Sequence, residues 1–227
     1  MSLELGDILA FVFVAYSIIL HEIAHAYAAL RFGDPTARAQ GRLSLSPVSH
    51  IDPVGTILFP ALQLLSTGRV FIGWARPVPV NYYNLRPRVA GDVVVSLAGI
   101  AVNLLLAVLA AVGLGLLGVD LFALQLGAGP SESELHRAVY WTMFANLGLA
   151  LFNLLPIPPL DGSHVMKYLL PRELRAGYER IGFFGIWILL VLIATDLVWR
   201  VLAPPLLWLL MRLLDLVVLV QGGPIPA

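Results

Sequence analysis

Long apolar runs separated by short polar stretches dominate the chain. Runs of about 18 or more apolar residues with few charges are typical of helices that cross a membrane. The pattern predicts about five such spans, at residues 5–31, 93–119, 138–155, 181–198 and 206–220. Arg200, Pro204 and Pro205 separate the last two runs. The chain is therefore expected to be an all-α multi-pass membrane protein.

The stretch between the first two spans follows different patterns. Alternating polar and apolar residues at 38–49, and short apolar pieces at 69–74 and 77–80, predict strands. Residues 53–65 are apolar but too few to cross the hydrocarbon core. Irregular backbone at membrane depth survives only where protein or water satisfies its polar groups. We therefore expect a small re-entrant and β-strand insertion beside a cavity.

Composition agrees with a membrane protein and excludes several other classes. Of the 227 residues 59% are hydrophobic and only 12% are charged, against roughly 25% charged in soluble domains. The formal net charge is zero, so the chain gives no reason to expect nucleic acid as a partner. There is no cysteine, so any metal would be held by His, Asp or Glu.

Basic residues predict the orientation in the membrane. They cluster between the first and second spans and again after the third: Arg31, Arg38, Arg42, Arg69, Arg76, Arg86 and Arg88, then Lys167, Arg172, Arg175 and Arg180. Loops rich in Lys and Arg lie on the cytoplasmic side. The N-terminus carries Glu4 and Asp7 but no basic residue, so we expect it to lie outside the cell. We expect the protein to reside in the cell membrane and to retain its first apolar run as a span.

The first predicted span contains the motif H-E-x-x-H at residues 21–25. Helical spacing places His21 and His25 one turn apart, where both imidazoles can bind one zinc ion, with Glu22 beside them as a candidate base. Ionisable residues inside a span are costly and mark functional sites. The alternative is a polar helix face satisfied by neighbouring helices, which explains the polar residues but not their spacing.

A catalytic zinc normally takes three protein ligands and leaves a fourth position for water. The best candidate for the third ligand is Asp161, which follows a helix end broken by Pro156, Pro158 and Pro159. The alternative is that Asp161 is a turn residue before a glycine. The His pair lies about 9 and 15 Å along its helix from Arg31, so the site is expected to be submerged yet reachable from the cytoplasm.

The sequence resembles the site-2 protease family of intramembrane metalloproteases. The resemblance rests on residues 21–26 (HEIAHA) and 153–162 (NLLPIPPLDG), with further similarity at 33–34, 41–45, 50–53, 73–78, 98–99 and 103. It implies that His21, His25 and Asp161 bind one zinc ion per chain and that Glu22 is the catalytic acid and base. The chain departs from the family at Ile100, where proline is common, and 227 residues leave no room for an appended PDZ or CBS domain. Its regulation is thereby left open.

Two further residues are weaker candidates. Asn153 could bind the substrate backbone or the developing oxyanion, or else join helices within the membrane. His50 could reach the site from the re-entrant segment, although a lone His is more often structural. Asn103 is expected to be structural.

The expected reaction is hydrolysis of peptide bonds in or near transmembrane segments of protein substrates, either releasing a regulator or clearing signal peptides. One domain, 1–227, would carry it, with a catalytic core at about 5–170 and further helices at about 181–220. A homo-oligomer is left open. The rival is a metal transporter or scaffold with the same ligands, which has no need of a base at Glu22. Another H-E-x-x-H protease with a Glu ligand is disfavoured because no Glu lies at matching depth in another span.

Overall fold

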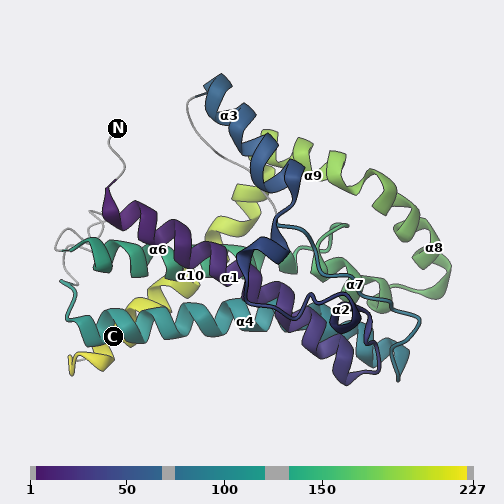
Figure 1. Ribbon diagram of the computed structural model, residues 1–227, viewed down its shortest axis with the longest axis horizontal. Coiled ribbons are helices and arrows are strands. Elements are labelled where there is room, and N and C mark those ends of the chain that lie inside the picture. The colour runs from purple at the N-terminus through teal and green to yellow at the C-terminus, as the bar shows by residue number, and fades with distance from the viewer. Residues whose placement is uncertain (1–3, 68–74, 121–132, 224–227) are drawn as a thin grey trace. The chain divides into compact units, whose positions relative to one another are not determined.

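The computed structural model describes residues 4–67, 75–120 and 133–223 (Figure 1). Every regular element in these ranges is a helix: α1 (Leu5–Arg31), α2 (Thr36–Ala39), η1 (Pro47–His50), η2 (Pro53–Leu58), α3 (Phe59–Thr67), α4 (Arg88–Leu117), α6 (Glu134–Leu154), α7 (Asp161–Leu169), α8 (Arg172–Ile181), η3 (Gly182–Phe184), α9 (Gly185–Ala194) and α10 (Leu197–Val220). The prediction of an all-α multi-pass membrane protein is confirmed.

Two compact units make up the chain. One comprises Met1–Ser17 and Ile100–Ala227, and the other comprises Ile18–Gly99. The division falls inside α1 and inside α4, so each of these helices contributes one end to each unit. The prediction of a single domain over residues 1–227 stays a prediction.

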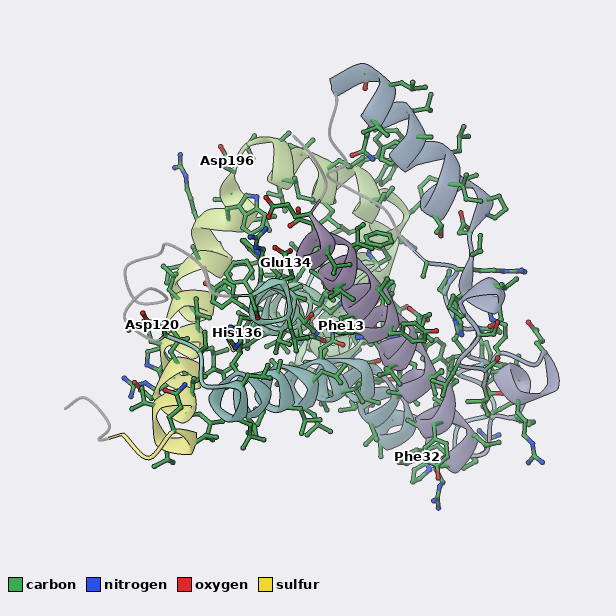
Figure 2. The ribbon with its side chains drawn as sticks, turned by 60° about the vertical axis from the view of Figure 1, so that its left-hand side comes forward. Phe13, Phe32, Asp120, Glu134, His136 and Asp196 are labelled. Carbon is green, nitrogen blue, oxygen red and sulfur yellow. The ribbon has the colours of Figure 1, made fainter. Side chains whose placement is uncertain are left out.

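The larger unit is built around α6, which lies beside α10 (Figure 1). Their facing side chains form one apolar core with the second half of α4: Ala107, Ala111, Leu114, Met143, Leu147, Leu206, Leu210, Leu213, Leu214 and Val217, together with Val119 after α4. Small residues on α4 let the helices approach closely. In a membrane, such close packing stabilises the association of helices, because lipid is as apolar as their side chains. At one end, Glu134 on the first turn of α6 accepts a hydrogen bond from the Gly6 backbone of α1 (Figure 2).

Within the part of the chain that the structure describes, four helical segments are long and apolar enough to cross a membrane: Leu5–Arg31, Arg88–Leu117, Arg172–Ala194 and Leu197–Val220. The predicted span at 138–155 does form a helix, α6, but α6 is not among the four. Helix α6 buries five of its residues: Ala138, Met143, Asn146, Leu147 and Ala150. A helix that is covered by other helices needs fewer apolar side chains on its surface than a helix that faces the bilayer. The number of five spans therefore stays a prediction.

The break between the last two helices differs from the prediction. We expected the chain to interrupt its helix near Arg200, Pro204 and Pro205, but α10 continues through both prolines. The interruption lies at Asp196, whose left-handed φ of 58° separates α9 from α10 (Figure 2). Prolines are tolerated in membrane helices because neighbouring groups satisfy the freed backbone carbonyls. Leu189 of α9 then packs with Val198 and Leu202 of α10.

The insertion between α1 and α4 also differs from the prediction. Residues 38–49 and 77–80 form no strand, and the predicted strand at 69–74 lies outside the described residues. Pro77 and Pro79 lack the N–H groups that a strand ladder needs, and a side chain binds the carbonyls of Arg76 and Pro77. Residues 53–67 are helical, as a π-helical turn of six residues followed by α3 of nine. At about 22 Å this helix is shorter than a bilayer core of about 30 Å.

Candidate metal centre and catalytic residues

His21 and His25 lie one turn apart on α1 and their rings converge. Their Nε2 atoms are 2.9 Å apart, and the ring centroids are 4.6 Å apart in an edge-to-face arrangement. Both side chains are buried, with exposed fractions of 7% and 9%. The spacing predicted from the motif is thus realised as two nitrogen atoms directed at one point.

The first half of α4 fixes this pair from the opposite side. The Nδ1 atom of His25 lies 2.7 Å from the backbone oxygen of Val95. A carbonyl only accepts, so we assign the proton to Nδ1, which leaves the lone pair of Nε2 available as a ligand. A Cβ atom at Gly99 would come within 2.5 Å of both His21 Cε1 and His25 Nε2. Only glycine gives the two rings room to converge.

The donor set fits zinc. Neutral imidazole nitrogen is a preferred zinc ligand, and two such atoms on one tetrahedral ion at about 2.0–2.1 Å lie roughly 3.3 Å apart. The observed 2.9 Å between the Nε2 atoms requires an opening of only a few tenths of an ångström. A hydrogen-bonded carbonyl on the far nitrogen of a histidine is the usual support of a metal ligand.

Glu22 extends from α1 toward the chain that precedes α4. Its Oε2 atom accepts a hydrogen bond of 2.7 Å from the backbone N–H of Val78. Glu22 is half-buried, and it adjoins His21 in the sequence. The carboxylate is therefore held by the protein on one oxygen, which limits its rotation.

The remaining predicted site residues fall in different places. Asp161 and Asn153 belong to the larger unit. Asp161 is the first residue of α7, and a Cβ atom at the next residue, Gly162, would lie 2.2 Å from the Leu154 oxygen. This close approach fixes the start of α7 against the end of α6. The Nδ2 atom of Asn153 donates to Leu149 O at 3.0 Å on its own helix, which uses one of its two hydrogens.

His50 ends the short helix η1 and is buried, with 2% of it exposed. Its Nε2 atom lies 2.8 Å from the Ser44 oxygen, and its own carbonyl accepts from the Arg76 N–H at 2.8 Å. These contacts brace the loop between α2 and α4. They favour the structural alternative that the sequence left open for this residue.

Sequence reasoning missed Val95, Gly99, Val78 and Arg42 as parts of this region. Val95 and Val78 act through backbone atoms, so their side chains carry no signal. Gly99 and Arg42 fall in stretches similar to the site-2 protease family, as Val78 does, and Arg42 is also one of the basic residues that predict the orientation. Neither position suggests metal or carboxylate chemistry until the chain is folded.

Comparison with known proteins places these observations in a family. The model of peptidase family M50 matches residues 121–193, a stretch that includes Asn153 and Asp161. "Putative zinc metalloprotease YwhC" of Bacillus subtilis is 43% identical over 191 residues, covering 84% of this chain and 82% of that protein. No solved structure matches.

"Putative zinc metalloprotease Rip2" of Mycolicibacterium smegmatis is 32% identical over 184 residues, covering 79% of this chain and 64% of that protein. The chain thus spans slightly less than two thirds of this longer relative. The Bacillus relative, in contrast, is matched over most of its length at high identity. The chain therefore belongs to peptidase family M50, the site-2 protease family.

Proposed function

We propose that this chain is a zinc-dependent endopeptidase that hydrolyses peptide bonds in or near the transmembrane segments of other membrane proteins. The observation that carries the proposal is the convergent pair of buried Nε2 atoms of His21 and His25, 2.9 Å apart, next to the carboxylate of Glu22. All three residues lie on a helix long and apolar enough to cross a membrane. Membership of a peptidase family supports the same reaction.

Three side chains would hold one zinc ion. His21 and His25 would each bind through Nε2, and a carboxylate oxygen of Asp161 is the proposed third ligand. Its support is the donor chemistry, the position of Asp161 at the rigid start of α7 and the resemblance of residues 153–162 to the family motif. When bound, the ion supplies Lewis acidity, which lowers the pKa of water and polarises the scissile carbonyl.

Glu22 moves the proton in this mechanism. It takes a proton from the attacking water as the water oxygen bonds to the carbonyl carbon, and it gives that proton to the amine nitrogen as the carbon–nitrogen bond breaks. The Val78 N–H holds one oxygen of the carboxylate, so the other oxygen carries the proton. Asn153 is the proposed donor to the carbonyl oxygen, through the second hydrogen of its Nδ2 atom.

Water and substrate reach the site by different routes. The basic residues that flank α1 and α4 support a cytoplasmic position for that end of both helices, and with it an N-terminus outside. Water then enters from the cytoplasmic side, because hydrocarbon cannot supply it. A substrate helix hides its carbonyls in its own hydrogen bonds, so it must unwind locally before hydrolysis. Release of a regulator and clearance of signal peptides are both compatible with this reaction.

Glu22→Gln tests the proposal. The amide keeps the size of the side chain but cannot take a proton, so we expect cleavage of a single-span substrate to fall by roughly 10²–10⁴-fold. Bound zinc, measured by elemental analysis, should stay at one per chain, because both histidines are untouched. A metal transporter or scaffold has no need of this base, so cleavage at the wild-type rate would contradict the proposal.

A further inference from the structure

A buried arginine lies in the insertion that precedes α4. Arg42 is only 6% exposed, and burying a charge is costly unless it is well paired. Its Nη2 atom donates to the backbone oxygen of Arg76 at 2.7 Å and more weakly to that of Pro77 at 3.4 Å. The guanidinium is thus used to bind backbone, at a position where the chain forms no helix or strand.

The two carbonyls belong to the segment that holds Glu22. The next N–H after them is that of Val78, which donates to Glu22 Oε2 at 2.7 Å. Because prolines at 77 and 79 lack an N–H, Val78 is the only backbone donor in residues 77–79. Any shift of this segment therefore moves the group that holds the carboxylate.

Other contacts keep the segment in place without reaching Glu22. The Arg76 N–H donates to the His50 oxygen at 2.8 Å. The Val78 side chain packs with Ala26 of α1 and Ala37 of α2. Burial and the positive charge of Arg76 lower the pKa of the Arg42 guanidinium, whereas the charge of Glu22 raises it.

We propose that Arg42 is a positioning residue for Glu22, acting through the backbone of Arg76, Pro77 and Val78. The guanidinium fixes two carbonyls, and the Val78 N–H that follows them fixes one carboxylate oxygen. This inference rests on the proposed role of Glu22 as the base. The hydrogen bonds of Arg42 go to the backbone of the segment that holds Glu22, so its removal should affect proton transfer more than zinc binding.

Arg42→Met tests the proposal in the full chain, in detergent or liposomes, with a single-span substrate. The thioether side chain keeps much of the volume but cannot donate. We expect kcat to fall by roughly 10–100-fold, the usual effect of losing a group that supports an active-site residue, with KM and zinc content little changed. Arg42→Lys keeps one donor to the Arg76 oxygen and should recover part of the loss.

Arg38→Met is the matched control, because Arg38 is an exposed arginine four residues away in the same stretch. It removes the same charge and should leave kcat at the wild-type value. A wild-type kcat in Arg42→Met, with Glu22→Gln inactive, would overturn the positioning role while leaving the proposed peptidase intact. Wild-type cleavage by Glu22→Gln would instead remove the peptidase mechanism itself.

A second pair of variants tests the positioning role of Arg42 if Arg42→Met fails to fold. Val78→Pro removes the N–H that holds Glu22, whereas Val78→Ala keeps the N–H and loses only packing. Val78→Pro should lower kcat by a factor similar to that of Arg42→Met, and Val78→Ala should do so much less. Where the double variant is stable, Arg42→Met should add little to Val78→Pro, because both break one chain of contacts. Equal kcat in Val78→Pro and Val78→Ala, or full additivity, would overturn the proposal.

Discussion

Different kinds of contact stabilise the two units of the chain. In the larger unit, α4, α6 and α10 meet through apolar side chains and small residues. In the unit of residues Ile18–Gly99, charged side chains bind backbone: Asp34 to Asn81, Arg42 to Arg76 and Glu22 to Val78. Helices satisfy their own backbone groups, whereas the irregular chain between α1 and α4 needs side chains to do so.

This difference separates stability from chemistry. The apolar helices can shift slightly without losing a specific bond, because many contacts share the energy. A polar contact is lost when one donor moves, and the proposed base Glu22 and the proposed ligand His25 are held by such contacts. Substitutions at the polar contacts of Ile18–Gly99 should therefore affect zinc binding or catalysis. Substitutions in the apolar core of the larger unit should affect unfolding.

Among substitutions that keep the proposed ligands and base, the largest effect is expected at the place where α4 touches the histidines. Gly99→Ala puts a Cβ atom within 2.5 Å of ring atoms of His21 and His25. The rings can move aside at modest cost in stability, but they then no longer converge. Zinc affinity should fall by roughly 10–100-fold while the helical content stays normal. Competition for zinc with a chelator measures the affinity, and circular dichroism measures the helical content.

Gly113→Ala, on the same helix, is the matched control for that substitution. The nearest atom to its added Cβ would be Val139 Cγ1 at 3.8 Å, an ordinary contact. Zinc content should therefore be unchanged and the helix slightly stabilised, since alanine is the better helix former by about 1 kcal/mol. Equal zinc affinities in the two variants would show that the close approach at Gly99 does not govern the metal site.

A core substitution in the larger unit should affect unfolding instead. Met143 of α6 is fully buried in the apolar core with Leu147. Met143→Ala leaves a cavity, and we expect a loss of about 2 kcal/mol, at the low end for such changes because lipid replaces water as the alternative environment. Thermal unfolding in detergent measures it, and Leu116→Ala, at a residue 77% exposed, is the control. Equal losses in the two would contradict the assigned core.

Asp34 tests the polar unit outside the spans. Burial raises its pKa, but hydrogen bonds from Thr36, Asn84 and Asn81 outweigh this, so the pKa lies below the usual 3.8. The stabilisation is fully present above pH 3.8 and is lost as the pH falls through the lower folded-state value. Asp34→Asn should cost about 1–2 kcal/mol near neutral pH and lessen this acid sensitivity. Unfolding curves from pH 7 to pH 2 test it, and unchanged acid sensitivity would contradict the assignment.

The smallest effect is expected at a polar contact inside the larger unit. Asn146 Nδ2 donates to Ser17 Oγ at 2.9 Å between α6 and α1. Ser17→Ala should cost about 0.6 kcal/mol, the average for such bonds within membranes. A shift in midpoint temperature larger than that of Met143→Ala would show that polar contacts, not the apolar core, dominate this unit.

The sequence predicted the long helices because lipid imposes a simple rule on α1, α4 and the C-terminal runs. It failed where neighbours decide the outcome. The prolines of α10 lie inside a helix, which membrane helices tolerate. The alternation at 38–49 produced no strand, and Arg42 in this stretch donates its side-chain hydrogen bonds to the backbone of Arg76 and Pro77.

The candidate site also has one part that the sequence predicted and one part that depends on the folded chain. The spacing of His21 and His25 is a property of a helix, so the sequence predicted it directly. Val95, Gly99 and Val78 act through backbone or through the lack of a side chain, so their contributions depend on contacts far apart in the sequence. The roles of His21, His25 and Glu22, like those of Asp161 and Asn153, remain predictions.

We propose that peptide bonds are hydrolysed within the membrane at this site, with Glu22 moving the proton and with His21 and His25 as the residues that would hold zinc. The most direct measurement is mass spectrometry of the products from a single-span substrate, with wild type and Glu22→Gln compared at equal zinc content. We predict product masses that place the cut in or near the spanning segment for the wild type, and no products for Glu22→Gln. Products of the same mass and rate from both proteins, or a cut confined to a distant soluble tail, would contradict the claim.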